Sequence, residues 1–234
     1  MARIIDFHSH ILPGIDDGSQ SLTESIAMLR REAEQGISHV VATPHFYPRY
    51  ETPEGFLRKR DEAEAALRRA INDVRGLPQF CVGAEVFYFR GISESDFLPQ
   101  LTIRGNRCIL IEMPPAPWPE FIYRELEDIW RRRGITPIIA HIDRYIAPLR
   151  THKIPQRLQQ LPVLVQANAS FFLESRTKRM ALKMLAADQI QLLGSDCHNL
   201  EGRPPRLGSA VEVIRQHLGD AALERIQAYQ KDIM

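Results

Sequence analysis

The stretch IIDFHSHILPGIDDG, residues 4–18, decides how this chain folds. It begins inside an apolar run of strand length, 3–7, and the polar segment His8-Ser9-His10 follows where that strand would end. His8 and His10 have the same parity along a strand, so both side chains can face the same way. Asp16 and Asp17 follow in a segment that is typical of a turn. We therefore expect an N-terminal strand whose carboxyl end carries functional side chains.

Short apolar runs and longer amphipathic segments alternate along the rest of the chain. The expected strands are 3–7, 37–42, 79–83, 108–112, 136–140, 163–166 and 190–194. The expected helices are 21–35, 53–74, 120–133, 154–160, 175–187 and two more in the C-terminal part. Strands separated by helices pair in parallel, and seven such units favour a closed or nearly closed barrel. No linker interrupts the pattern, which predicts a single α/β domain over residues 1–234.

Composition and charge exclude several classes of protein. The net charge of +1 indicates no nucleic-acid-binding surface, so no nucleic-acid partner is expected. The longest apolar runs are far shorter than the roughly 20 residues that cross a bilayer, and the N-terminus lacks an apolar signal stretch. Three cysteines without paired spacing fit a reducing compartment. We expect a cytoplasmic protein without a membrane-inserted segment.

Side chains that bind metals or phosphate follow most of the expected strands. In chain order they are His8 and His10, His45, Glu85, Glu112, His141 with Arg144, Asn168, and Asp196 with His198. The carboxyl ends of parallel strands in a barrel meet at one mouth, so these residues are expected in one pocket. Each residue alone has an ordinary structural explanation, and the prediction depends on their occurring together. His39, His152 and His217 lack this placement and are expected to be ordinary surface or helix residues.

The residue types indicate a metal centre that acts on phosphate. Imidazole and carboxylate ligands suit zinc, manganese and iron. A carboxylate such as Glu85 can bridge two ions, and a metal cluster can position a phosphate and generate hydroxide at neutral pH. The sequence therefore favours a metal-dependent phosphoesterase.

Several motifs together resemble one family. They are DFHSHILPGIDDG (6–18), ATPHF (42–46), GAEVF (83–87), IEMP (111–114), AHIDRY (140–145), QANASFF (166–172) and GSDCHNLEGRPPRLG (194–208). The chain resembles the polymerase-and-histidinol-phosphatase (PHP) superfamily, and within it the manganese-dependent protein-tyrosine phosphatases of bacterial capsule and exopolysaccharide gene clusters. The resemblance implies a distorted (β/α)7 TIM-like barrel that holds a cluster of three divalent ions, with manganese favoured over iron or zinc.

The resemblance also implies a ligand set. The first ion would be held by His8, His10, Glu85 and Asp196, the second by Glu85, Glu112 and His141, and the third by Asp17, His45 and His198. Arg144 and Arg203 would clamp the phosphate, for which a guanidinium fork is suited. Family members often carry Pro-Glu where this chain has Ile142-Asp143, so we expect a loop of different shape in which His141 and Arg144 keep their spacing. The choice of Asp17 over its neighbour Asp16 depends on the resemblance alone.

The implied activity is phosphotyrosine-protein phosphatase, a phosphoric monoester hydrolase, with in-line attack by a metal-activated hydroxide. A phenol has a pKa of about 10, so a tyrosine leaving group depends less on a general acid than serine does. A metal-linked water and Asp17 are both candidates for that acid. The implied substrate is the tyrosine-rich tail of a membrane-associated tyrosine kinase that regulates capsule or exopolysaccharide synthesis, and a homo-oligomer is compatible with the resemblance.

Besides a nuclease or proofreading activity, against which the near-zero net charge argues, three other interpretations compete with this one. Cys197 and Arg203 have the C-x5-R spacing of cysteine-nucleophile phosphatases, but Glu201 would repel a phosphate and Pro204-Pro205 offer no backbone N–H donors. A small-molecule phosphatase such as a histidinol-phosphate hydrolase would use the same metal site, so it stays open. The third alternative is a non-catalytic, metal-stabilised binding module, which would bind metal without hydrolysing a phosphate ester.

Overall fold

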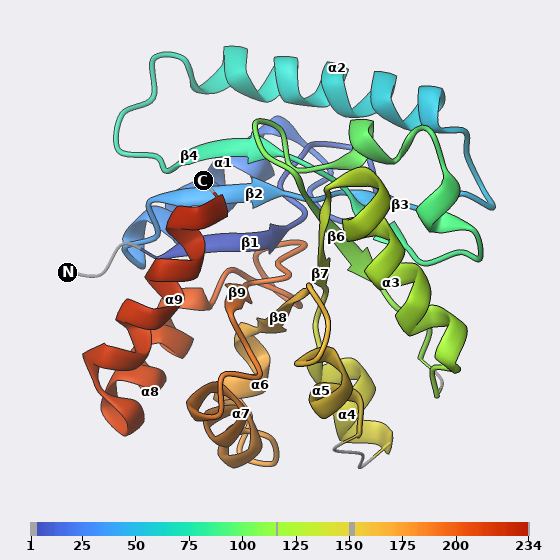
Figure 1. Ribbon diagram of the computed structural model, residues 1–234. Coiled ribbons are helices and arrows are strands. Elements are labelled where there is room, and N and C mark those ends of the chain that lie inside the picture. Colours follow the sequence, from blue (N-terminus) through green and yellow to red (C-terminus); the bar gives the residue numbers. More distant parts are fainter. Residues whose placement is uncertain (1–3, 116, 150–152, 234) are drawn as a thin grey trace.

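The computed structural model describes residues 4–115, 117–149 and 153–233, and it has helices around a parallel β-sheet (Figure 1). The strands are β1 (Ile5–Ser9), β2 (His39–Ala42), β3 (His45–Phe46), β4 (Gln79–Val82), β5 (Glu85–Phe87), β6 (Cys108–Glu112), β7 (Thr136–Ile139), β8 (Leu164–Asn168) and β9 (Leu192–Gly194). They form two hydrogen-bonded groups, β1-β2-β4 and β3-β5-β6-β7-β8-β9, and the paired strands are parallel. The predicted α/β class with a parallel sheet is confirmed.

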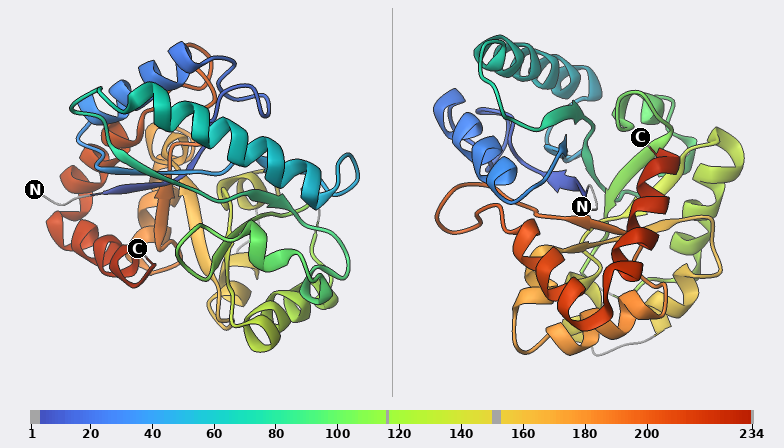
Figure 2. Two further views of the ribbon diagram at one scale, coloured as in Figure 1. Left: turned by 90° about the horizontal axis from the view of Figure 1, so that it is seen from above. Right: turned by 90° about the vertical axis from the view of Figure 1, so that its left-hand side faces the viewer.

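The sheet curls so that its ends approach each other (Figure 2). Only Thr43-Pro44 separates β2 from β3, and only Gly83-Ala84 separates β4 from β5. The short strands β3 and β5 therefore follow directly after β2 and β4. The segment that follows β9 reaches β1. The backbone N–H of His10 donates to Cys197 O at 2.9 Å, and that of Asp196 donates to His8 O at 2.8 Å. β1 therefore has β2 on one side and the end of β9 on the other.

Helices cover the outside of this curled sheet (Figures 1 and 2). The α-helices are α1 (Leu22–Glu34), α2 (Pro53–Ile71), α3 (Glu120–Arg133), α4 (Asp143–Leu149), α5 (Lys153–Leu158), α6 (Ala169–Leu173), α7 (Lys178–Ala186), α8 (Leu207–Leu218) and α9 (Asp220–Ile233). Two short 3-10 helices, η1 (Ile92–Glu94) and η2 (Leu98–Leu101), lie between β5 and β6. No helix within the described ranges is long and apolar enough to cross a membrane.

The helix boundaries follow the predicted signals where those signals are strong. Ser21 caps α1 by accepting the N–H of Glu24, and α3 ends at Gly134, whose φ of 59° suits glycine. The sequence did not predict the short helices α4 and α6 or the short strands β3 and β5. The predicted helix 175–187 begins later, at Lys178.

The apolar core consists of two clusters of buried side chains. The larger one joins strands and helices and includes residues from Ile4 to Ile226. The smaller one draws on several strands and on α9; its buried members are Phe7, Val41, Ile103, Cys108, Leu110, Ile138, Ala140, Leu192 and Ile233. On β1, Phe7 precedes His8, and on β6, Leu110 precedes Glu112. Apolar packing thus fills the strands up to their carboxyl ends, where the polar residues begin.

Candidate metal centre

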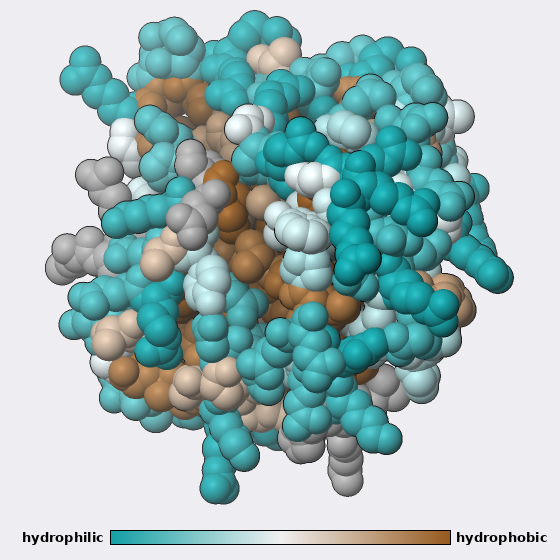
Figure 3. Space-filling view, in the orientation of Figure 1, coloured by the Kyte–Doolittle hydropathy of each residue, from teal (hydrophilic) through white to brown (hydrophobic). Residues whose placement is uncertain are grey.

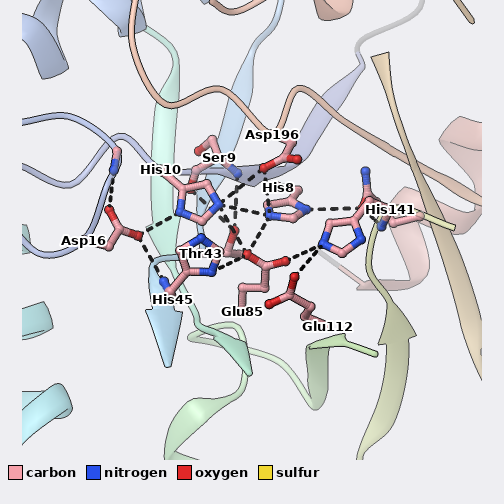
Figure 4. Close-up of polar contacts among 12 residues, drawn as sticks. His8, Ser9, His10, Asp16, Thr43, His45, Glu85, Glu112, His141 and Asp196 are labelled. Atoms are coloured by element: carbon pink, nitrogen blue, oxygen red, sulfur yellow. Dashed lines mark hydrogen bonds and ion pairs between the residues drawn. The ribbon is translucent and has the colours of Figure 1, made fainter. Parts of the chain in front are cut away.

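The predicted ligands converge at the carboxyl ends of the strands, and Figure 4 labels all of them except Asp17 and His198. Three overlapping groups could each hold a metal ion: His8, His10 and Glu85; His45, Glu85 and Glu112; and His10, Asp17, His45 and His198. His141 and Asp196 adjoin these groups, with His141 Nε2 2.7 Å from Glu85 Oε1 and Asp196 Oδ1 3.5 Å from His8 Nε2. The structure therefore brings every predicted ligand into one cluster.

The first group is buried and has the spacing of a cation site. His8 Nε2 lies 3.1 Å from His10 Nε2, 3.2 Å from Glu85 Oε2 and 3.5 Å from Asp196 Oδ1. His10 Nε2 lies 3.4 Å from Glu85 Oε2 and 3.5 Å from Asp196 Oδ1. An ion with bonds of about 2.0–2.2 Å holds neighbouring ligand atoms roughly 3.0–3.5 Å apart. Glu85 Oε2 and Asp196 Oδ1 are buried, and their short contacts to His45 Nδ1 (2.8 Å) and Arg203 Nη2 (2.7 Å) lack hydrogen-bond geometry, so the donor set fits a divalent cation.

The histidine nitrogens that point away from this centre have protein partners. Asp16 Oδ2 lies 2.7 Å from His10 Nδ1, and the hydroxyl of Tyr145 lies 3.1 Å from His141 Nδ1. The backbone oxygen of Asp196 lies 3.1 Å from His198 Nδ1. A partner that binds the proton on Nδ1 leaves the lone pair of Nε2 free, which is the usual arrangement behind a metal-binding histidine.

Glu85 lies between two of the groups. Its Oε2 faces His8 and His10 and lies 2.8 Å from His45 Nδ1, while its Oε1 faces His141. Glu112 Oε1 is 3.7 Å from His141 Nε2 on that second side. One buried carboxylate therefore presents each oxygen to a different set of ligands, as a bridging ligand would.

The two neighbouring aspartates have different surroundings. Asp17 is exposed by 67%, and its Oδ1 lies 3.3 Å from His45 Nε2 and 3.4 Å from His198 Nε2. Asp16 instead accepts the backbone N–H groups of His45 and Gly18 and contacts His10. Burial would raise the pKa of Asp16, but His10 and these hydrogen bonds outweigh it and hold the pKa well below its ordinary value. Asp17 therefore faces two imidazoles of a candidate ion site, whereas Asp16 contacts the nitrogen of His10 that points away from the cluster.

Charge within the cluster is balanced by the histidines. Burial opposes an increase in the pKa values of His8 and His10, but carboxylates, Glu85 and Asp196 among them, outweigh burial and raise both. Burial likewise opposes ionisation of Glu85 and Asp196, but the histidines hold their pKa values well below ordinary ones. Glu85 and Asp196 are therefore ionised, and the positive charge that they require can come from protons on imidazole or from a cation.

His141 and His198 shift in the opposite direction. Burial lowers the pKa of His141, and burial with the charges of His10 and Arg203 lowers the pKa of His198 to about 4. A neutral imidazole is the form that binds a metal, so these two residues are already in that form at neutral pH.

Two arginines stand at the edge of the cluster. Arg144 Nη2 lies 2.6 Å from Asp196 Oδ2, and Arg203 Nη2 lies 2.7 Å from Asp196 Oδ1. Their side chains are 40% and 39% exposed, and both line a cavity of about 320 Å³. Much of the surface drawn in Figure 3 is hydrophilic, with hydrophobic residues showing mainly in its hollows. Half-exposed guanidinium groups beside buried metal ligands can contact a phosphate that enters from solvent.

The loop with Ile142-Asp143 has a clear structural basis. Asp143 begins α4, and its Oδ1 accepts the backbone N–H of Asn168 at 3.3 Å. Burial raises the pKa of Asp143 to about 6. His141 has a φ of 32°, which turns the chain sharply before this helix. The departure from the Pro-Glu pattern thus leaves both His141 and Arg144 at the cluster.

Residues outside the cluster separate from it as expected. His39 contacts Ser38 and Gln79, and the exposed His217 lies against the backbone oxygen of Val213, away from the predicted ligands. His152 lies outside the described residues. Cys197 is fully buried, and burial raises the pKa of its thiol well above the ordinary value, which argues against a cysteine nucleophile.

The sequence did not predict that three polar side chains, two of them tyrosines expected near the mouth, contact the proposed ligands. Gln166 contacts His8, the hydroxyl of Tyr145 contacts His141, and the hydroxyl of Tyr47 donates to Glu112 Oε2 at 3.3 Å. Gln166 belongs to the quoted QANASFF motif and is a polar residue inside an apolar strand, a signal that pointed to it without giving a role.

These features define the class: an α/β protein whose curled parallel sheet carries a histidine–carboxylate metal centre at its carboxyl ends. Residues 4–232 match the family described as Capsular polysaccharide synthesis, CpsB/CapC. The chain belongs to this family, and the predicted resemblance is confirmed.

Named relatives and a solved structure agree with this assignment. The chain is 32% identical to tyrosine-protein phosphatase CpsB of Streptococcus pneumoniae over 226 residues, covering 92% of this chain and 91% of that protein. It is 28% identical to tyrosine-protein phosphatase YwqE of Bacillus subtilis, covering 92% and 85%. A crystal structure from a study of YwqE and CpsB, described as metal-dependent tyrosine phosphatases, superimposes with a TM-score of 0.84 at 23% identity and covers 99% of this chain and 96% of that one. That structure supports the curled-sheet fold.

Proposed function

We propose that this chain is a metal-dependent phosphotyrosine-protein phosphatase. The observation that carries the proposal is the buried convergence of His8, His10, Glu85 and Asp196, with two carboxylate oxygens that receive no hydrogen bond of good geometry and with Arg144 and Arg203 beside them. A metal centre next to half-exposed arginines suits a phosphate monoester. The names of the CpsB and YwqE relatives supply the phosphotyrosine substrate.

We propose a cluster of three divalent ions. His8, His10, Glu85 and Asp196 would hold the first; Glu85, Glu112 and His141 the second; and Asp17, His45 and His198 the third. Manganese is our first choice, with iron and zinc as alternatives, because imidazole and carboxylate ligands suit all three. Such a cluster supplies a nucleophile at neutral pH by lowering the pKa of bound water, and it neutralises charge on the phosphate.

The other residues act on the substrate. Arg144 and Arg203 would bind the free phosphate oxygens and stabilise the charge that spreads over them during in-line attack. Asp17 is the most exposed of the proposed ligands, at 67%, and we propose that it can also pass a proton to the leaving oxygen. A phenolate leaves readily because the pKa of its acid is about 10, so this proton transfer would contribute less than the arginines do.

The test compares substrates and metal content in the same preparation. We expect hydrolysis of para-nitrophenyl phosphate and of a phosphotyrosine peptide, loss of both after chelation, and loss of both in Asp196→Ala. Full activity after either treatment would rule out metal-dependent catalysis at this site. A preference for histidinol phosphate would support the small-molecule alternative, and bound metal without any turnover would support the binding module.

Architecture and context are proposed with the function. The hydrogen bonds between β1 and the end of β9 support a distorted (β/α)7 barrel, and the core cluster from Ile4 to Ile226 supports one domain over 1–234. We propose the tyrosine-rich tail of a membrane-associated kinase as substrate, because the family's description concerns capsular polysaccharide synthesis. The free cysteines support a cytoplasmic location. Self-association of the chain stays a prediction.

A further inference from the structure

A buried glutamine connects the two sides of the first ligand group. Gln166 Oε1 accepts the backbone N–H of His141 at 2.7 Å and lies 3.3 Å from His8 Nδ1. Its Nε2 donates to Asn168 Oδ1 at 3.0 Å, and Asn168 Nδ2 donates to Asp196 Oδ2 at 2.8 Å. One chain of hydrogen bonds therefore runs from a backbone amide to a ligand carboxylate, with His8 as a branch.

The two ends of this chain fix the direction of every hydrogen bond in it. The backbone N–H of His141 can only donate, so the Gln166 atom that faces it must be the oxygen. The amide nitrogen of Gln166 then faces Asn168, which accepts with its oxygen and turns its own nitrogen toward Asp196. An ionised carboxylate only accepts, so this orientation satisfies both amides. Flipping the Gln166 amide would place its NH2 group against the backbone N–H of His141. Flipping the Asn168 amide would place its oxygen against the carboxylate of Asp196.

This direction decides which nitrogen of His8 carries the proton. Gln166 Oε1 has no hydrogen, so His8 Nδ1 must donate to it. In the neutral ring the lone pair is then on Nε2, which faces His10 Nε2 at 3.1 Å and Glu85 Oε2 at 3.2 Å. Asn168 engages Oδ2 of Asp196, while Oδ1 points at His8 Nε2 from 3.5 Å.

We infer that Gln166 and Asn168 are positioning residues of the first metal site. Gln166 holds His8 in the tautomer that offers Nε2, and Asn168 turns Asp196 so that Oδ1 faces the same point. The inference rests on the proposed function in one respect, namely that a cation binds between these ligands. Residues that bind the far side of a ligand in this way typically contribute about 10–100-fold to metal affinity.

The backbone of β9 closes the space around the glutamine. A Cβ on Gly194 would lie 2.6 Å from His8 Cβ and 2.7 Å from Gln166 Nε2. Contacts that short displace one of the two side chains, so the glycine lets β9 approach both of them. The amide is therefore confined on one side by main chain, which favours a single orientation.

The first test measures Zn²⁺ affinity by calorimetric titration of the metal-free full chain. We expect Gln166→Met, which keeps length but loses the hydrogen bonds, to weaken the tightest site about 10–100-fold. Gln191→Met is the matched control. Gln191 is also buried; its Oε1 accepts the N–H of Val165 and its Nε2 donates to the oxygen of Asp188, away from the ligands. This control should bind zinc as the wild type does.

The second measurement reads the tautomer directly. In ¹⁵N–¹H correlation spectra of the zinc-loaded wild type, His8 should carry a slowly exchanging proton on Nδ1. Gln166→Met should lose that protection, and Gln166→Glu, which keeps an oxygen opposite His8, should restore it in part. Asn168→Ala removes the donor to Asp196 and the acceptor of Gln166 Nε2, but it leaves Gln166 Oε1 opposite His8. It should weaken zinc binding about tenfold while leaving the His8 signal in place. It also provides a second variant should Gln166→Met fold poorly.

The outcomes separate the two proposals. A wild-type protein that binds no zinc, manganese or iron would overturn the proposed function itself. A wild type that binds zinc, with Gln166→Met equal to it in both affinity and His8 tautomer, would overturn only the positioning role. Equal weakening by Gln191→Met would show that any lost glutamine hydrogen bond has this effect, and the inference would fall on that result as well.

Discussion

Two buried glutamates near the end of β1 have opposite properties. Glu85 is 1% exposed and lies in the metal centre, whereas Glu32 on α1 is 0% exposed and lies in a cluster with Asp6 and Cys197. Although burial opposes ionisation of Glu85, His8 and the other histidines hold its pKa well below the ordinary value. Burial and the charge of Asp6 raise the pKa of Glu32 well above it. The pKa of the same side chain, equally buried, is lowered at one place and raised at the other.

The difference shows what turns a cluster of donor residues into a metal centre. Both clusters contain groups that could hold an ion, so residue type and burial alone do not distinguish them. Glu85 has imidazoles around it and Arg144 nearby, which offset the cost of burying its charge. Glu32 faces another carboxyl group and a thiol, and a retained proton is the simplest way to avoid two buried charges. The two clusters thus differ in the charged groups that surround the glutamate.

The largest effect should come from changing the ionised glutamate. Glu85→Gln keeps the shape but removes the charge shared by the two ligand sets, and we expect kcat/KM for a phosphotyrosine peptide to fall about 10³-fold or more, equivalent to roughly 4 kcal/mol. Bound metal, measured by elemental analysis, should fall with it. Glu32→Gln is the matched control and should retain both metal and activity. Unchanged turnover in Glu85→Gln would contradict the bridging role.

The second-largest effect should come from an arginine at the edge of the metal centre. Arg203→Lys keeps a positive charge but loses the planar fork, and we expect kcat/KM to fall about 10²-fold. Because the change lies at a half-exposed edge, metal content should stay at the wild-type level. The paired measurement is inhibition by inorganic phosphate, which should weaken. A variant that loses metal instead would mean that Arg203 supports the ligands rather than the phosphate.

A third prediction concerns the protonated glutamate and applies to the chelated protein. The pKa of Glu32 is raised in the folded state, so its stabilising effect is complete below the unfolded value of 4.5 and is lost as pH rises toward the folded value. Glu32→Gln cannot ionise. The wild type should lose stability between pH 5 and pH 8, whereas the variant should not. The unfolding free energy of the variant minus that of the wild type should therefore rise over this range, by about 1–3 kcal/mol in all. Urea unfolding at several pH values measures this, and parallel curves for the two proteins would contradict it.

Local sequence signals were sufficient for much of the fold. Capping at Ser21 and the glycine at Gly134 set the limits of α1 and α3, and the apolar runs located the longer strands. The two-residue strand β3 and the five-residue helix α6 are too short to show a period, so their contacts with the rest of the fold decide them.

The candidate site was predictable as a set of residues but not as a network. The positions of the ligands at strand ends identified them, because parallel strands end at one mouth. The roles of Asp16 and Gln166 depend on contacts across 6 and 158 positions of the chain, with His10 and His8 respectively. No spacing rule contains that information. Likewise, nothing in the sequence around Glu32 shows that Asp6 faces it.

The smallest effect on activity should come from Cys197, which lies in the Glu32 cluster but is flanked by two proposed ligands. Cys197→Ala removes the only thiol that could attack a phosphate with C-x5-R spacing, yet we expect kcat/KM and metal content close to wild type. The side chain is fully buried, so its loss should instead lower the unfolding free energy by about 1–2 kcal/mol. Phosphatase assays and urea unfolding of one preparation measure both. If activity falls to background while metal stays bound, the thiol takes part in the chemistry. If metal is lost, the two clusters are not independent. The contrast between Glu85 and Glu32 would then have to be explained as a property of one connected site.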